Sequence, residues 1–181
     1  MLIIDLDDFR SDCKVGTLLA LKKAIPNFKV TLFTIPGLCT TDFLDVWKRE
    51  TWCSLVPHGL MHPHPRECQE WSYEWSCNYL SGIEPLGLER GFKAPGWQIS
   101  DGMYQALLER GYWVADQTYN NERRPAALPV YLLDHPSKIH GHLGHLGGHN
   151  ANELQLILPQ IMDHAGEEFG FVKDNLQKGG D

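Results

Sequence analysis

The sequence predicts an α/β fold, a parallel sheet or barrel with helices on its outside. Short runs rich in β-branched and aromatic residues alternate with helical patterns along the whole chain. Polar side chains follow several of the expected strands, and loops at the carboxyl ends of parallel strands commonly build active sites. The 181 residues show no internal repeat or linker and suit one domain, 1–181.

The expected strands are short apolar runs that end at a polar residue or a turn signal. The first is closed by Asp7 and Asp8, and the second runs into Pro36-Gly37. A short third strand ends just before His58. In chain order, the expected strands cover residues 2–6, 29–35, 53–56, 112–115, 130–133 and 169–172, and a further strand end and turn covers 91–97.

The expected helices place apolar residues on one face and start at capping residues. Thr41 or Asp42 caps a helix that runs through Arg49, and Ser100 caps one that stops at Gly111. The remaining helices rest on three periodic sets: Val15, Leu18, Leu19 and Ile25; Trp71, Trp75 and Tyr79 within residues 65–80; and Leu154, Ile157, Leu158 and Ile161.

Composition and charge exclude several classes of protein. The formal charge of −7 and the lack of a Lys/Arg run argue against nucleic acid as a partner. No apolar stretch approaches the roughly 20 residues of a membrane span, and we expect no signal peptide. The five cysteines are odd in number and form no C-x-x-C pair, so we expect a reducing, cytoplasmic setting.

Two pairs of residues have the chemistry of a hydrolytic metal site. Asp7 and Asp8 follow a strand, and they converge only if that strand bends at Leu6 or Asp7. His58 and His62 are four residues apart, and the proline after His62 favours a turn over a helix. Two imidazoles and one carboxylate suit Zn²⁺ and leave positions open for water and substrate.

In order and spacing, these motifs resemble the polysaccharide deacetylase family, which is the NodB homology domain or carbohydrate esterase family 4. Each motif is degenerate, but together they cover most of the chain. The family's five motifs are matched, in order, by Asp5-Leu6-Asp7-Asp8-Phe9, His58-Gly59-Leu60-Met61-His62-Pro63, Lys93-Ala94-Pro95-Gly96-Trp97, Asp116 and Ile139-His140-Gly141-His142.

The resemblance implies a distorted, incomplete (β/α)7-type barrel of the glycoside hydrolase/deacetylase type. It implies that Asp8, His58 and His62 hold a divalent metal, with zinc preferred and cobalt, nickel or manganese as alternatives. Asp7 would be the general base and Asp116 would take the place of the fourth motif's aspartate. Lys93 replaces the family's arginine, and lysine cannot make the same planar two-pronged contact.

A late histidine would supply the proton for the departing amine. His142 is the first choice and His140 the second; they alternate with Gly141, so both point to one face of a strand. His145, His149 and His135 remain alternatives. Asp134-His135 is a further candidate for the fifth motif. Pro95, Trp97 and Tyr73 are the expected substrate contacts, and a backbone N–H after His58 or near Tyr73 would be an oxyanion donor.

We therefore expect a metal-dependent hydrolase that removes N-acetyl, or alternatively O-acetyl, groups from an acetylated sugar or polysaccharide. Two other hypotheses stay open. One is a non-catalytic module that binds glycan or metal, which the replacement of the family's arginine by Lys93 favours. The other is a metal-dependent hydrolase of a different amide, as in related enzymes that open cyclic ureides or imides. The sequence leaves the oligomeric state and the substrate's identity open.

Overall fold

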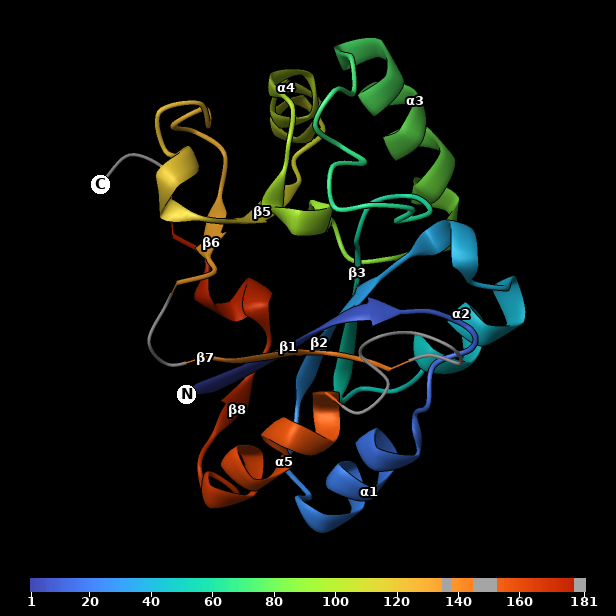
Figure 1. The fold of residues 1–181 in the computed structure, drawn as a ribbon, viewed down its shortest axis with the longest axis vertical. Coiled ribbons are helices and arrows are strands. Elements are labelled where there is room, and N and C mark those ends of the chain that lie inside the picture. The colour runs from blue at the N-terminus through green and yellow to red at the C-terminus, as the bar shows by residue number, and fades with distance from the viewer. Residues whose placement is uncertain (135–137, 145–152, 178–181) are drawn as a thin grey trace.

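A computed structural model describes residues 1–134, 138–144 and 153–177 (Figure 1). Its strands and helices alternate as the sequence predicts. The strands are β1 (Leu2–Phe9), β2 (Val30–Thr34), β3 (Cys53–Pro57), β4 (Gly91–Lys93), β5 (Trp113–Asp116), β6 (Val130–Leu132), β7 (Lys138–His142) and β8 (Phe169–Gly170). The α-helices are α1 (Gly16–Ala24), α2 (Thr41–Trp47), α3 (Tyr73–Ile83), α4 (Asp101–Glu109) and α5 (Glu153–Asp163).

The strands form a curled, parallel half-barrel. One sheet has the order β3-β2-β1-β7, and β8 also pairs with β1; the other has the order β4-β5-β6. Each pairing is parallel, and a bridge between His58 and Lys93 connects the end of β3 to β4. The helices lie outside the strands in Figure 1. The expected distorted, incomplete barrel is therefore confirmed.

Apolar side chains fill both sides of the curled sheet. Outside it, Leu18 of α1 and Ile161 of α5 pack with β1 and β2, while Leu80 of α3 and Met103 of α4 pack over β4 and β5. A third cluster lies within the curl: Ile3, Phe33, Val56, Trp113, Ala115, Tyr131, Leu133 and Val172. Because β1 is buried on both faces, its near-continuous apolar run is the pattern of a central parallel strand.

Several elements differ from their predicted bounds. The first strand runs to Phe9, and α2 is capped by Thr40 instead of Thr41 or Asp42 and ends at Trp47. The helix expected over residues 65–80 begins at Tyr73, because the Ser72 side chain accepts a hydrogen bond from Trp75 N–H and caps it. Trp71 therefore precedes the helix, although its ring packs 4.8 Å from that of Tyr79. The last strand ends at Gly170, and a 3₁₀ turn, Val172–Asn175, follows.

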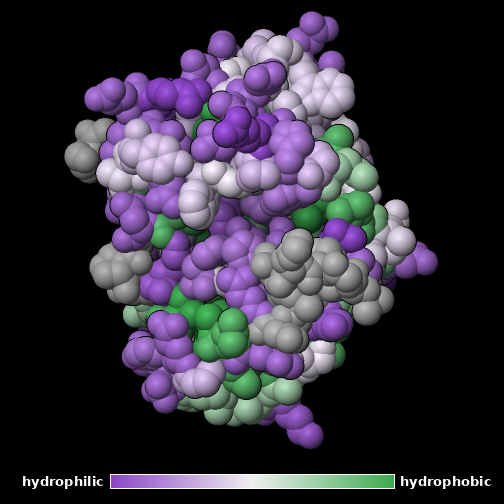
Figure 2. Space-filling model, viewed as in Figure 1, coloured by the Kyte–Doolittle hydropathy of each residue, from purple (hydrophilic) through white to green (hydrophobic). Residues whose placement is uncertain are grey.

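Within the described ranges, no helix combines the length and the apolar character that crossing a membrane requires. On the face of the molecule shown in Figure 2, hydrophilic residues predominate across the middle of the molecule, and hydrophobic patches are concentrated towards its sides and lower part.

Candidate active site

Asp7 and Asp8 reach the same cavity because β1 is irregular at its end. The register with β2 shifts between Leu6 and Phe9, and Asp8 has a positive φ of 64°. This irregularity removes the strict alternation that would send neighbouring side chains to opposite faces. The predicted bend is present, but the left-handed residue is Asp8 rather than Leu6 or Asp7.

His58 and His62 enter the cavity from a turn that follows β3. Gly59 and His62 have positive φ values of 64° and 49°, so the segment is a turn and not a helix, as the flanking prolines predict. The Glu67 carboxylate accepts hydrogen bonds from the N–H groups of Leu60, Met61 and His62, at 3.0, 2.9 and 3.1 Å. The turn is thereby fixed, and these N–H groups after His58 already have an acceptor.

The cavity has a volume of about 340 Å³. A water molecule occupies about 30 Å³ in the liquid, so the space admits an acetyl group together with water. Nine residues from the ends of β1, β3, β4 and β7 and their loops line it: Asp7, Asp8, His58, His62, Pro65, Gly96, Trp97, His140 and His142. Seven of the eleven site residues expected from the sequence are thus brought together.

Asp8, His58 and His62 have the donor set and spacing of a metal site. One ligand atom from each lies within 4.8 Å of the others. His62 Nε2 is 3.6 Å and His58 Nε2 4.0 Å from Asp8 Oδ1, whereas tetrahedral zinc ligands stand about 3.3 Å apart. His58 Nδ1 is 2.9 Å from the Lys93 carbonyl oxygen, and such a partner fixes the ring so that Nε2 faces the site. These three residues therefore fit a divalent cation.

Asp7 is buried and held by a buried cation. Lys93 Nζ donates to Asp7 Oδ1 at 2.6 Å and lies 3.5 Å from Asp5 Oδ1. Burial alone would raise the pKa of Asp7, but Lys93, with help from nearby histidines, outweighs burial and holds that pKa well below its usual range. The Asp7 carboxylate is consequently ionised, with Oδ2 directed at the cavity histidines.

Burial disfavours the protonated form of His58. The residue is 1% exposed, and burial lowers the pKa of its ring to about 4 despite the attraction of Asp7. A neutral imidazole has a free lone pair on one nitrogen, which is the form that binds a metal. His58 is thus in the state that a ligand needs at neutral pH.

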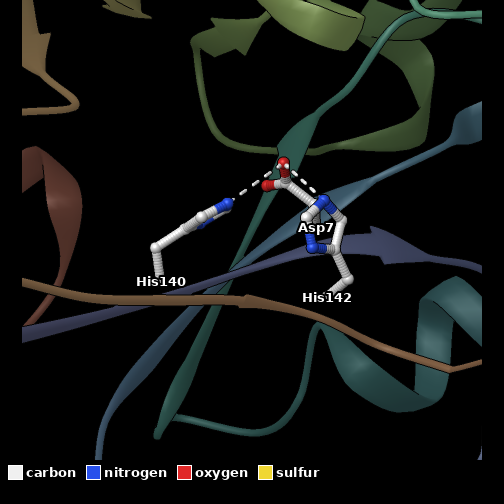
Figure 3. A group of neighbouring side chains, drawn as sticks. All are labelled: Asp7, His140 and His142. Atoms are coloured by element: carbon white, nitrogen blue, oxygen red, sulfur yellow. Dashed lines mark ion pairs between the residues drawn. The ribbon is translucent and has the colours of Figure 1, made fainter. Parts of the chain in front are cut away.

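His140 and His142 rise side by side from β7 toward Asp7, as Figure 3 shows. Residues two apart on a strand share a face, and β7 pairs with β1 so that His142 lies opposite Asp7. Both Nε2 atoms are 3.9 Å from Asp7 Oδ2. The prediction that both histidines share one face is confirmed, and their distances from Asp7 leave the choice between them open.

The other expected site residues lie elsewhere or outside the described ranges. Asp116 accepts hydrogen bonds from Tyr104, Asn120 and Arg124 in a buried cluster. The exposed Tyr73 begins α3, and its hydroxyl bonds to Glu109. Pro95 is buried and close to Gly59. Asp134 is exposed and accepts a bond from Thr118; His135, His145 and His149 lie outside the described residues.

Three carboxylates near the site were missed by reasoning from the sequence. Asp5 is fully buried and contacts His140 Nδ1 at 2.6 Å; its place two residues before Asp7 on a strand was a usable signal. Glu153 Oε2 lies 2.7 Å from His142 Nδ1. Glu153 and Glu67 come from loop or helix positions that carry no local pattern for this role.

Solved structures with similar folds are carbohydrate esterases and deacetylases. A family 4 acetyl xylan esterase from Clostridium thermocellum, in complex with a cobalt ion, has a TM-score of 0.63 and 13% identity, covering 95% of this chain and 88% of that chain. A family 4 carbohydrate esterase from Streptomyces lividans, in complex with acetate, has a TM-score of 0.61 and 14% identity. The match covers 99% of this chain and 97% of that chain. The chitin deacetylase from the fungal pathogen Colletotrichum lindemuthianum has a TM-score of 0.58 and 12% identity. The match covers 95% of this chain and 85% of that chain.

The chain shares the fold of family 4 carbohydrate esterases. No family model matches the sequence, and no curated protein does. At these identities the likeness concerns the fold.

Proposed function

We propose that this protein is a metal-dependent hydrolase that removes acetyl groups from an acetylated sugar, with N-acetyl groups as the first choice and O-acetyl groups as the alternative. The observation that carries the proposal is the convergence of Asp8, His58 and His62 beside the ionised carboxylate of Asp7. A divalent cation held by the first three would supply a Lewis acid for the acetyl carbonyl and make a nearby water more acidic.

Asp7 is the proposed general base. Its Oδ1 is engaged by Lys93, which leaves Oδ2 to accept the proton of the attacking water. Lys93 keeps the carboxylate in place through one short contact where the family pattern has an arginine. That contact supports a catalytic protein over a binding module, because the ion pair to the base is present.

A histidine of β7 is the proposed proton donor to the leaving group. His142 remains the first choice and His140 the second, as each presents Nε2 on the side of the cavity where Asp7 Oδ2 lies. Asp5 orients the His140 ring through a 2.6 Å hydrogen-bond contact with Nδ1, and the Glu153 carboxylate lies 2.7 Å from His142 Nδ1.

The proposed substrates follow from the cavity and from the similar proteins. The relatives of known fold include proteins named for acetyl xylan and chitin, and Trp97 offers an exposed ring at the cavity edge for a sugar face. A neutral acetylated oligosaccharide also suits an acidic chain better than a nucleic acid does.

The test is acetate release from N-acetylated and O-acetylated oligosaccharides by the metal-loaded chain, measured beside Asp7→Asn and Asp116→Asn. Asp7→Asn keeps the size of the side chain and removes the base, so we expect a loss of about 100-fold or more. Asp116→Asn controls for the loss of a buried charge outside the cavity. Equal acetate release by the native chain and Asp7→Asn would refute the proposed base.

A further inference from the structure

The histidines of β7 resemble the first metal-binding pair closely. The ring centroids of His140 and His142 are 5.2 Å apart with an interplanar angle of 67°, and those of His58 and His62 are 5.1 Å apart at 67°. A carboxylate faces each pair: Asp7 faces His140 and His142, and Asp8 faces His58 and His62. The cavity thus contains two similar arrangements of two imidazoles and one carboxylate, contributed by different strands.

We propose that Asp7, His140 and His142 form a second divalent-cation site, adjacent to the site of Asp8, His58 and His62. One ligand atom from each residue lies within 4.8 Å of the others. Asp7 Oδ2 is 3.9 Å from each Nε2, which is within the range of distances found at the first site. A closure of about half an ångström per pair would bring these atoms to the roughly 3.3 Å spacing of tetrahedral zinc ligands.

The partners of the two rings favour coordination through Nε2. His140 Nδ1 lies 2.6 Å from Asp5, and His142 Nδ1 lies 2.7 Å from Glu153. Histidine ligands of metals commonly have a carboxylate or carbonyl partner at the other nitrogen, which fixes the tautomer and raises the basicity of the ligating atom. The site therefore has three candidate ligands, a hydrogen-bonded support for His140 and a carboxylate close to His142 Nδ1.

The local charge also suits a cation. Asp5, Asp7, Asp8 and Glu153 contribute four carboxylates around the cavity, and they outnumber the two ammonium groups, of Lys93 and Lys138, that interact with Asp5 and Asp7. The Lys93 contact engages Asp7 Oδ1 and leaves Oδ2 available as a ligand.

Occupancy of the second site would inhibit the enzyme, an expectation that rests on the proposed function. Its ligands are the general base and both candidate proton donors, and a lone pair bound to a cation cannot accept or carry a proton. Acetate release should therefore rise with the first equivalent of metal and fall with the second. The second site is a regulatory site for excess divalent cation.

The test is equilibrium dialysis of the chelator-treated full chain against Zn²⁺. We expect two equivalents for the native chain, one for His140→Ala/His142→Ala, and one for His58→Ala/His62→Ala. The matched control is His145→Ala/His149→Ala, which removes two histidines from the same glycine-rich stretch of sequence and should retain two equivalents.

A milder variant decides the question if the double variants fail to fold. Glu153→Gln keeps all ligands but weakens the support of His142, so the affinity of the second equivalent alone should fall about 10-fold to 100-fold. A native stoichiometry of one overturns the second site. So does a second equivalent that survives His140→Ala/His142→Ala, that keeps its native affinity in Glu153→Gln, or that disappears in the control. Because dialysis needs no substrate, a lack of acetate release would count against the proposed function alone.

Discussion

Lys93 Nζ lies 2.6 Å from Asp7 Oδ1, and both side chains are buried, with Asp7 in the wall of the cavity. The same ammonium group is 3.5 Å from Asp5 and 4.6 Å from the centre of the Phe33 ring. A single buried cation therefore stabilises two carboxylates and positions the proposed base. The first prediction follows from this dependence.

Lys93→Met should destabilise the protein by about 3 to 5 kcal/mol at neutral pH, because two buried carboxylates lose their cation. Urea unfolding followed by circular dichroism measures the change. Lys93→Arg is the matched control, since it keeps the charge and adds volume, at a cost of about 1 to 3 kcal/mol. Equal stability of the native chain and Lys93→Met would contradict the role of Lys93.

The stability difference between the native chain and Lys93→Met should depend on pH. Asp5 and Asp7 have lowered pKa values in the folded chain, against the effect of burial, because of Lys93. A lowered carboxyl pKa contributes stability above the unfolded value of about 3.9 and loses it as the pH falls further. Without Lys93, burial raises both carboxyl pKa values, so the difference should begin to shrink above pH 4 as the variant takes up protons, and it should shrink further below pH 4 as the native chain loses its ion pairs. Urea titrations at several pH values check this, and a difference that grows in acid would be the wrong sign.

Glu67→Gln should weaken metal binding at the Asp8, His58 and His62 site by about 10-fold. The Glu67 carboxylate accepts three backbone N–H bonds in the turn that carries His62, and an amide offers one acceptor oxygen. Metal affinity by competition with a chelator is the measurement. Glu70→Gln, at an exposed position in the same segment, is the control and should bind metal as the native chain does.

Trp97→Ala should raise KM for an acetylated oligosaccharide between about twofold and tenfold, with a smaller effect on kcat. The ring is 38% exposed at the cavity edge, and an aromatic contact contributes about 0.5 to 1.5 kcal/mol. Tyr73→Phe should have less effect, because the hydroxyl that it removes bonds to Glu109. Steady-state kinetics compare the two, and an unchanged KM in Trp97→Ala would remove Trp97 from the substrate site.

The sequence contained enough information for the fold and for most of the residues that line the candidate site. Alternating strand and helix patterns predict the half-barrel, because buried parallel strands must be apolar on both faces. Asp7, His58 and His142 fall at strand ends, where parallel topology brings distant segments together. These features follow from local pattern combined with one topological rule.

Other features depend on tertiary contacts that a local pattern does not encode. The positive φ of Asp8 is stabilised within the register shift between β1 and β2, so its position was predicted one or two residues too early. The Glu67 carboxylate accepts hydrogen bonds from the turn that carries His62, and the Glu153 carboxylate of α5 lies beside His142 of β7. Asp116 was assigned by order along the chain, whereas its hydrogen bonds come from α4 and the segment after β5.

The most direct test of the account is the anomalous scattering of a crystal grown with one equivalent of Co²⁺. We predict a single strong peak about 2.0 to 2.2 Å from Asp8 Oδ1 and from Nε2 of His58 and His62. Asp7 should lie next to this peak and keep its hydrogen bond from Lys93. A cation bound elsewhere, or an empty position between these three residues in the metal-loaded protein, would contradict the central claim.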